Sequence, residues 1–215
     1  MSRIIVRDKK ELELLLAKIP RYRGWRRELE QYETPSSIVS HILWLAYLKG
    51  DVYSKNIAEP GCGTGVFSIG ALLLGASKSI CIDIDNSILE HTHSVVKNIF
   101  RNLSHRLILV NSDIRDLEVN SVDTVIMNPP FGVYRRNRGL DLFFLRKAMG
   151  MAYSIYSLHK YSPMLEEIIT DLSRDWGFDI TYSERLKFPI PMMYPTHRRR
   201  IYIVETVLYV FRKRM

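Results

Sequence analysis

The residues of this chain that point most directly to chemistry are Asn128-Pro129-Pro130-Phe131, which follow an apolar run ending at Met127. A short, nearly all-apolar run is typical of a buried parallel strand. Because Pro129 has no backbone N–H, the chain offers acceptors here without a competing donor. Asn128 Oδ1 and the Pro129 carbonyl would hold the two hydrogens of an exocyclic nucleobase amine, with Phe131 stacked on the ring. The alternative is a proline-rich strand end with Asn128 as a turn residue.

Three glycines at alternate positions, Gly61, Gly63 and Gly65, lie between a strand expected at residues 56–59 and an apolar helix expected at 66–74. Such glycines let the backbone approach a ligand closely at a helix N-terminus. No Gly-Lys-Ser/Thr follows, which excludes a triphosphate-binding loop. The next strand ends at Asp83, which is placed to accept hydrogen bonds from both ribose hydroxyls of a nucleoside cofactor. Asp85 or its neighbour Asn86 would instead cap the following helix.

Together these stretches resemble class I methyltransferases that use S-adenosylmethionine, in the Asn-Pro-Pro-Phe form of the amino-methyltransferases. The stretches 29–35, 141–145 and 156–160 narrow the likeness to the small archaeal and eukaryotic enzymes that modify one adenine N6 of small-subunit ribosomal RNA. This resemblance covers roughly residues 10 to 212 and implies an α/β, doubly wound, Rossmann-like fold. Its sheet would have seven strands, mostly parallel, with an antiparallel C-terminal edge pair.

The resemblance also implies roles for single residues. Gln31 and Thr34 would lie near the methionine end of the cofactor, and Asp113 would accept from its adenine amino group with Ile114 against the ring. Without the resemblance, Thr34 is a helix N-cap, Gln31 a surface residue and Asp113 a turn residue. The expected catalytic residues are Asn128, Pro129, Pro130 and Phe131, and the expected cofactor-binding residues are Gln31, Thr34, Glu59, Gly61, Gly63, Thr64, Gly65, Val66, Asp83, Asp113, Ile114 and Asn128.

Three positions depart from the family pattern. Many methyltransferases have Asp where this chain has Glu59, so Glu59 is only a candidate for the cofactor's amino group. Relatives have Leu in place of Pro60 and a hydroxyl residue in place of Val133, which leaves substrate positioning at Val133 open.

The charge of the chain favours a polyanionic partner. Its formal net charge is +8 and its pI is about 9.5, and arginines cluster with tyrosines in stretches expected to be loops. The glycine-bounded stretch 132–139 is expected to be a mobile loop. A basic face without a partner is the alternative to RNA binding. The residues expected to contact RNA are Arg135, Arg136, Arg138, His197, Arg198, Arg199 and Arg200.

Hydrophobic periodicity predicts the elements that position these residues. Helices are expected at 8–18, 38–49, 87–100, 141–150 and 163–177, with Ile99 and Ile168 facing inward. Strands are expected at 79–83, 106–111, 122–127, 152–158, 178–186 and 201–212, the second of them being too apolar for an exposed edge. We expect residues 1–35 to form a helical extension over the cofactor site and residues 36–215 to form the methyltransferase domain.

The two cysteines, Cys62 and Cys81, are expected to be reduced, with no disulfide and no metal site. No apolar run approaches the length of a membrane span, and the first residues lack the apolar core of a signal peptide. We therefore expect a soluble, unsecreted, cytoplasmic protein.

The sequence thus predicts transfer of a methyl group from S-adenosylmethionine to adenine N6 in RNA. A protein methyltransferase acting on a glutamine amide is the second hypothesis, because that amide presents a similar N–H₂ group. A catalytically silent scaffold that binds RNA or nucleosides is the third. The resemblance further implies a heterodimer with a small zinc-binding activator protein along the strand that contains Leu107 to Val110, any zinc belonging to the activator. A homodimer, or cover by the N-terminal helix, would also fit this edge.

Overall fold

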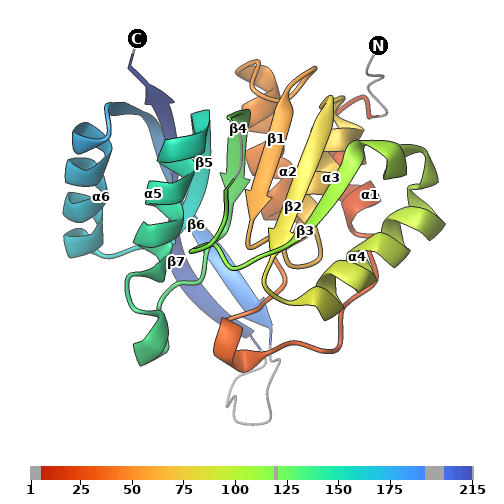
Figure 1. Ribbon diagram of the computed structural model, residues 1–215, viewed down its shortest axis with the longest axis horizontal. Helices are drawn as coiled ribbons and strands as arrows, with labels where there is room; N and C mark the ends of the chain where they lie inside the picture. Colours follow the sequence, from red (N-terminus) through yellow and green to blue (C-terminus); the bar gives the residue numbers. More distant parts are fainter. Residues whose placement is uncertain (1–5, 119–120, 192–200, 215) are drawn as a thin grey trace.

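The computed structural model describes residues 6–118, 121–191 and 201–214, which form a mixed sheet covered by helices on both faces (Figure 1). The strands are β1 (Asn56–Pro60), β2 (Lys78–Asp83), β3 (Leu107–Asn111), β4 (Val122–Met127), β5 (Ala152–Lys160), β6 (Phe178–Pro191) and β7 (Ile201–Lys213). The α-helices are α1 (Lys9–Leu16), α2 (Ser36–Leu48), α3 (Val66–Leu73), α4 (Asn86–Ile99), α5 (Leu140–Met151) and α6 (Pro163–Asp175). Short 3₁₀ helices are η1 (Arg27–Leu29), η2 (Arg101–Arg106) and η3 (Arg135–Asn137).

The sheet confirms the predicted fold class. Its seven strands lie in the order β3-β2-β1-β4-β5-β7-β6. The first five pair in parallel, and β7 pairs antiparallel with both β5 and β6. The chain order reverses between β1 and β4, so the loops that leave these two strands diverge around a crevice at their carboxyl ends. The stretches 61–65 and 128–131 are these two loops.

Two apolar layers hold the helices to the sheet. Side chains of α1, α2, α3 and α4 pack on one face, and those of α5 and α6 pack on the other. Along β1, Ile57 joins the first layer and Ala58 the second, as the alternation of a strand requires. Because both faces are covered, four of the five residues of β1 and five of the six residues of β4 are buried.

Helix starts follow the expected capping chemistry. Asp8, Asp85 and Ser162 each accept a hydrogen bond from a backbone N–H in the first turn of α1, α4 and α6. Two inward-facing predictions are wrong: Ile99 is 42% exposed and Ile168 is 40% exposed. Ile99 lies in the last turn of α4, and α6 buries only a narrow stripe that includes Ile169 and Leu172.

The expectation that residues 106–111 are too apolar for an exposed edge is also wrong. β3 is the outermost strand of the sheet, and Ile108 is 41% exposed (Figure 1). β3 is apolar because α4 and η2 pack against it. Its free edge is not buried. No strand of the described residues pairs with the outer edge of β3.

The β6–β7 hairpin is longer than the sheet beside it. β5 pairs with β7 only from Thr206 to Arg212, so residues 201–205 of β7 pair with β6 alone. This protruding half lies beyond the carboxyl end of β5, at the same edge of the sheet as the two loops named above. Residues 192–200 lie outside the described part of the chain. No helix in the described ranges is both long and apolar enough to span a bilayer.

Candidate active site

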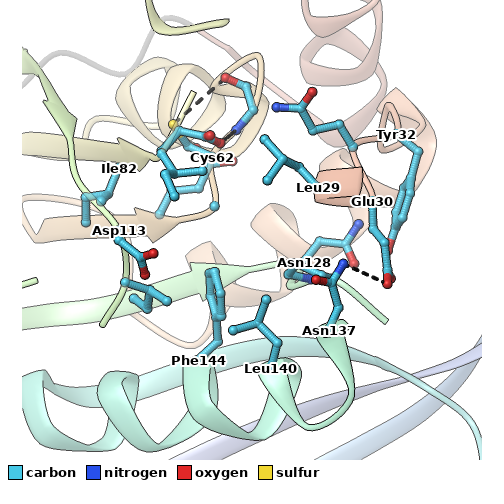
Figure 2. A pocket seen from close by; sticks show the side chains of 18 of the residues that line it. Leu29, Glu30, Tyr32, Cys62, Ile82, Asp113, Asn128, Asn137, Leu140 and Phe144 are labelled. Carbon is cyan, nitrogen blue, oxygen red and sulfur yellow. Dashed lines mark hydrogen bonds between the residues drawn. The ribbon is translucent and has the colours of Figure 1, made fainter. Parts of the chain in front are cut away.

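A cavity of about 360 Å³ opens at the carboxyl ends of β1 and β4. Its walls come from the ends of β1, β2, β3 and β4, from the start of α5, and from two segments that we name here. The N-terminal strap comprises residues 26–34, and the arginine loop comprises residues 132–139. Figure 2 shows Asp113 and Ile82 on one side of the cavity, with Glu30, Tyr32 and Asn128 on the other.

Eleven of the twelve residues expected at the cofactor line this cavity, and Gly65 does not. Gly65 has a φ of 68° and precedes α3. A Cβ at this position would lie 2.7 Å from Cγ2 of Thr92 in α4. Gly65 is therefore required for the left-handed turn and for the packing of the loop on α4. The residues that do line the cavity are Gln31, Thr34, Glu59, Gly61, Gly63, Thr64, Val66, Asp83, Asp113, Ile114 and Asn128.

Glu59 lies at the closed end of the cavity and is 2% exposed. Its carboxylate accepts hydrogen bonds from the backbone N–H groups of Phe67 and Ser68, at 3.3 and 2.7 Å, and so caps the start of α3. Burial raises the pKa of Glu59 to about 8, although the hydrogen bonds from Ser68 and Phe67 oppose the shift. A nearby cation would favour the ionised form of this group.

Asp83 lies where the strand-end prediction places it. Oδ2 accepts from the Gly63 N–H at 2.8 Å, and Oδ1 accepts from the Asp85 N–H at 2.9 Å. Burial raises the pKa of Asp83. Asp113 faces the same cavity from the end of β3 and forms a 3.0 Å ion pair with Arg115. The side chains that line this end are thus carboxylates able to accept from the hydroxyl and amino groups of a nucleoside.

The expectation that both cysteines are reduced is wrong. Cys62 and Cys81 form a disulfide with a Cα–Cα distance of 5.3 Å. The pairing follows from the sheet: the Cys62 N–H donates to the Ile82 carbonyl, so the loop after β1 folds back onto the neighbouring strand β2. A separation of 19 residues gives no sign of this contact, because it depends on the parallel pairing of β1 with β2. The disulfide joins the glycine loop to the strand that ends in Asp83.

Asn128 is the central polar group of the other half of the cavity. Its Nδ2 donates to Thr34 Oγ1 at 3.1 Å. Its Oδ1 is buried and has no hydrogen-bond partner among the described residues. A buried acceptor without a partner on a cavity wall calls for a donor from outside the chain. Of its neighbours in the predicted motif, Pro130 lines the cavity, whereas Pro129 and Phe131 do not.

Phe131 packs inside an aromatic cluster and is 9% exposed. Its ring centroid lies 5.2 Å from that of Tyr32 in the N-terminal strap and 5.8 Å from that of Phe188 in the protruding half of β6. This cluster holds the loop after β4 against two segments that are distant in sequence. Stacking of Phe131 on a substrate ring stays a prediction.

The N-terminal strap is fixed at both ends of the cavity. The Gln31 amide donates to Asp85 Oδ2 at 3.1 Å and accepts from the Arg26 N–H at 2.8 Å. Both polar groups of Gln31 therefore have protein partners, and its predicted place at the methionine end of the cofactor stays untested. Thr34 reaches the other end through Asn128.

The predicted RNA contacts fall in two places. Arg135, Arg136 and Arg138 lie in the arginine loop, all exposed, and Arg136 also lines the cavity. His197 to Arg200 lie outside the described residues. The loop expected to be mobile is bounded by Gly132 and Gly139, which have φ values of 70° and 76°.

Comparison with known proteins places this geometry in a family. The chain is 35% identical over 201 residues to the rRNA N6-adenosine-methyltransferase METTL5 of Danio rerio, covering 89% of this chain and 92% of that protein. It is 30% identical over 190 residues to rRNA N6-adenosine-methyltransferase Mettl5 of Drosophila melanogaster, covering 85% and 86% of the two chains. The chain belongs to the METTL5 family. It is therefore a methyltransferase that depends on S-adenosylmethionine.

Two further matches are also to methyltransferases. The structure of PH1948 from Pyrococcus horikoshii superposes with a TM-score of 0.85 at 33% identity, covering 98% of this chain and all 100% of that one. A family model described as ribosomal protein L11 methyltransferase (PrmA) matches residues 42–129. That match includes Glu59, Asp83 and Asn128 and ends before the arginine loop.

The residues of this METTL5-family chain fit the cofactor of the family. The carboxylates of Asp83 and Asp113 line the cavity and could accept hydrogen bonds from the hydroxyl and amino groups of an adenosine moiety. Glu59, at the closed end, would attract an ammonium group. Positive φ values at Gly61 and Gly63 expose the loop backbone to the cavity.

The sequence reasoning missed three residues of the site. Glu30, Tyr134 and Asn137 connect the N-terminal strap to the arginine loop through hydrogen bonds of 2.9 to 3.0 Å. Glu30 stands inside the stretch 29–35 that supported the family resemblance, but the residue types alone give no sign of its partner more than 100 positions away.

Proposed function

We propose that this METTL5-family methyltransferase methylates N6 of a single adenosine in small-subunit ribosomal RNA. The observation that carries the proposal is Asn128 Oδ1, a buried acceptor without a partner in the described chain, at the cavity wall opposite the cofactor acids. An exocyclic amine supplies the missing donor.

The chain's part in the reaction is to hold the amine. The target adenine leaves its stack and enters the cavity. Asn128 Oδ1 and the Pro129 carbonyl accept its two N6 hydrogens, which turns the nitrogen lone pair out of the ring plane and toward the methyl donor. S-adenosylmethionine supplies the activated methyl group. Positioning of this kind provides most of the rate enhancement, and the product loses its proton to water without a strong base on the enzyme.

Arginines around the cavity mouth would bind the RNA backbone. Arg135 and Arg138 are exposed beside Arg136, which lines the cavity. We propose that His197, Arg198, Arg199 and Arg200, which lie between β6 and β7 in the sequence, extend this surface, since the protruding half of the hairpin lies at the same edge of the sheet as the cavity. Affinity for RNA would then fall steeply with salt concentration.

We further propose that residues 1–35 are an extension that closes the cofactor site and that residues 36–215 are the methyltransferase domain. Leu29, Gln31 and Thr34 line the cavity. α1 packs against α2 and α3 and anchors the extension to the domain.

A glutamine side-chain amide in a protein is the second candidate substrate. The match of residues 42–129 to a family of ribosomal protein methyltransferases favours it. The net charge of +8 on the whole chain and the exposed arginines of the arginine loop argue for RNA, because a protein loop offers little negative charge.

The decisive experiment is methyl transfer from labelled S-adenosylmethionine to small-subunit RNA, followed by nucleoside analysis. We expect the label in N6-methyladenosine at one position, and its loss with Asn128→Ala. Label that goes only to glutamine in protein would overturn the adenine proposal.

We also propose that a small zinc-binding activator protein covers the free edge of β3 and that the heterodimer acts in the cytoplasm. Ile108, in the middle of this strand, is 41% exposed, and Ile84, after the neighbouring strand, is 50% exposed. An apolar edge strand is a ready template for a strand of a partner.

Ile108→Asp tests the activator proposal without touching the cavity. We expect the variant to fold but to lose a stoichiometric complex with the activator in size-exclusion chromatography. Leu14→Asp, at an exposed apolar position on α1, is the matched control and should retain the complex. Retention by Ile108→Asp would place the partner elsewhere.

A further inference from the structure

We propose that Glu30 is a positioning residue that holds the arginine loop over the cavity and links the ordering of this loop to cofactor binding. The inference deepens the proposed function, because the loop it positions is the one proposed to contact RNA. The geometry that supports it does not depend on the identity of the substrate.

One carboxylate oxygen of Glu30 accepts two of the hydrogen bonds that join the N-terminal strap to the arginine loop, and Arg27 of the strap donates a further one to the Tyr134 hydroxyl. Oε1 accepts from the Tyr134 N–H at 2.9 Å and from Asn137 Nδ2 at 3.0 Å (Figure 2 shows the second bond). Asn137 Nδ2 also donates to the Glu28 carbonyl at 3.1 Å. Since both acceptors lack a hydrogen, the orientation of the Asn137 amide is fixed.

The surroundings of Glu30 are unusual for a side chain with only a structural role. Glu30 is 8% exposed, and among the described residues its carboxylate has no Lys, Arg or His within ion-pair distance. Its φ of 53° is left-handed, which is uncommon for a residue with a Cβ. A buried carboxylate without a cation is unfavourable, but hydrogen bonds to it are stronger than those to an amide. This unfavourable burial of a carboxylate occurs where the N-terminal strap contacts the arginine loop.

The second oxygen, Oε2, is buried without a partner, as is the nearby Tyr32 hydroxyl, among the residues that the structure describes. Figure 2 shows Glu30 and Tyr32 side by side at the end of the cavity that holds Asn128. Glu30 lines the cavity, so its free oxygen is available to a donor that arrives with a ligand. The Glu30 carboxylate therefore has an acceptor, at the contact between strap and loop, that no described residue uses.

The residue after Glu30 connects the strap to the cofactor acids. Gln31 Nε2 donates to Asp85 Oδ2 at 3.1 Å, and the Asp85 N–H donates to Asp83 Oδ1 at 2.9 Å. A cofactor that binds Asp83 and fills the space beside Leu29 and Gln31 therefore orders the strap. An ordered strap fixes Glu30, and Glu30 fixes the loop that presents Arg135 and Arg138. Fixed cations bind an RNA backbone with less loss of conformational entropy.

Trypsin measures the state of the loop directly, because it cleaves after Arg135, Arg136 and Arg138. In the wild-type chain we expect S-adenosylhomocysteine to slow cleavage at these sites. In Glu30→Ala, cleavage should be several-fold faster than in the wild type and should no longer respond to the ligand. The affinity for S-adenosylhomocysteine should fall by a smaller factor than the cleavage rate rises. Glu30→Gln keeps one acceptor oxygen and should lie between the two.

Asn137→Ala removes the partner of Glu30 in the arginine loop and tests the same contact independently of any folding defect in Glu30→Ala. If Glu30 acts through Asn137, the double variant should be cleaved no faster than either single variant. Glu33→Ala is the matched control: this carboxylate lies in the same strap but pairs with exposed Arg21 and does not line the cavity. Thermal unfolding midpoints should be similar across the set. Wild-type cleavage that ignores the ligand, or a Glu30→Ala loop that stays protected, would overturn the proposal.

Kinetics with RNA separate this proposal from the proposed function. For Glu30→Ala we expect the KM for RNA to rise about tenfold, with a smaller change in kcat. Equal losses in kcat and no change in KM would indicate a different role for Glu30. If the wild-type enzyme methylates no RNA at all, the proposed substrate is wrong, but the trypsin result still decides whether Glu30 couples the loop to the cofactor.

Discussion

The two halves of the cavity are built in different ways. On the cofactor side, polar groups bond to neighbours close in the chain: Gly63 to Asp83 across 20 positions, and Ser68 to Glu59 across 9. On the substrate side, Asn128 bonds to Thr34 across 94 positions and Asn137 to Glu30 across 107. The first half is nearly complete within one β-α-β unit. The second exists only after the strap, the loop after β4 and the β6–β7 hairpin have met.

The match to ribosomal protein L11 methyltransferases covers residues 42–129, which include the β-α-β unit of the cofactor half and also Asn128. The strap and the arginine loop, which make the long-range contacts of the substrate half, lie outside this range. Substitutions in the two halves should therefore fail differently.

The largest effect should come from the substrate half. Asn128→Ala removes the free acceptor, and we expect kcat to fall by about 10²–10³-fold, the usual effect of losing one group that stabilises a transition state. Affinity for S-adenosylmethionine, measured by calorimetry, should stay nearly unchanged. Asn98→Ala, at an exposed site on α4, is the control and should be fully active. Loss of cofactor binding together with turnover would show that Asn128 is structural.

The disulfide is the next largest contribution and belongs to the cofactor half. Reduction of Cys62–Cys81 should lower the free energy of unfolding by about 3 kcal/mol, because the bond restricts the unfolded chain. Urea unfolding with and without a reductant measures this change, and Cys62→Ser with Cys81→Ser should reproduce it. If both thiols react with an alkylating agent in the denatured, unreduced protein, the bond is absent.

Glu59, in the cofactor half, should make the free energy of unfolding depend on pH. Its pKa is about 8 in the folded chain, against 4.5 for a glutamate side chain exposed to water, so the folded state binds more protons between these values. The contribution of Glu59 to the free energy of unfolding therefore falls as pH rises through this window, by up to about 1.4 kcal/mol per pH unit.

The folded chain without cofactor favours the protonated form of Glu59. Binding of the cofactor's ammonium group near Glu59 should favour the ionised form instead. S-adenosylmethionine affinity should rise from pH 6 to pH 8 with release of a proton, by at most about tenfold per pH unit. Calorimetry in buffers of different ionisation enthalpy detects that proton, and Glu59→Gln should abolish it. An unchanged pH profile in Glu59→Gln would assign the proton to another group.

The smallest effect should come from Tyr32. Burial raises the pKa of Tyr32, and its hydroxyl has no partner in the described chain. Tyr32→Phe should keep the packing against Phe131 and raise the free energy of unfolding by about 1 kcal/mol, since it removes a buried unsatisfied group. A chemical-denaturation curve measures this. If methylation also falls, the hydroxyl has a partner in the RNA-bound enzyme.

The sequence and its family resemblance predicted the fold class, the antiparallel edge pair and eleven residues that line the cavity. Apolar strands, alternate glycines and strand-end carboxylates impose their positions within about one β-α-β unit. The predictions that Ile99 and Ile168 face inward and that β3 is not an exposed edge were wrong. In each case the apolar residue types did not show that no neighbouring element of the described chain covers the position. Apolar composition reports burial on average and does not say which surface provides it.

By itself, the sequence determined the fold class, most of the residues expected at the cavity wall and the place of Asn128 at the end of β4. Only the tertiary structure decided that Cys62 meets Cys81, that Phe131 packs between Tyr32 and Phe188, and that Glu30 holds the arginine loop. Backbone geometry and side-chain period act over a few residues and can be deduced from the chain. Contacts between distant segments depend on how the strands pair and the loops cross, and these are fixed only when the whole sheet has formed.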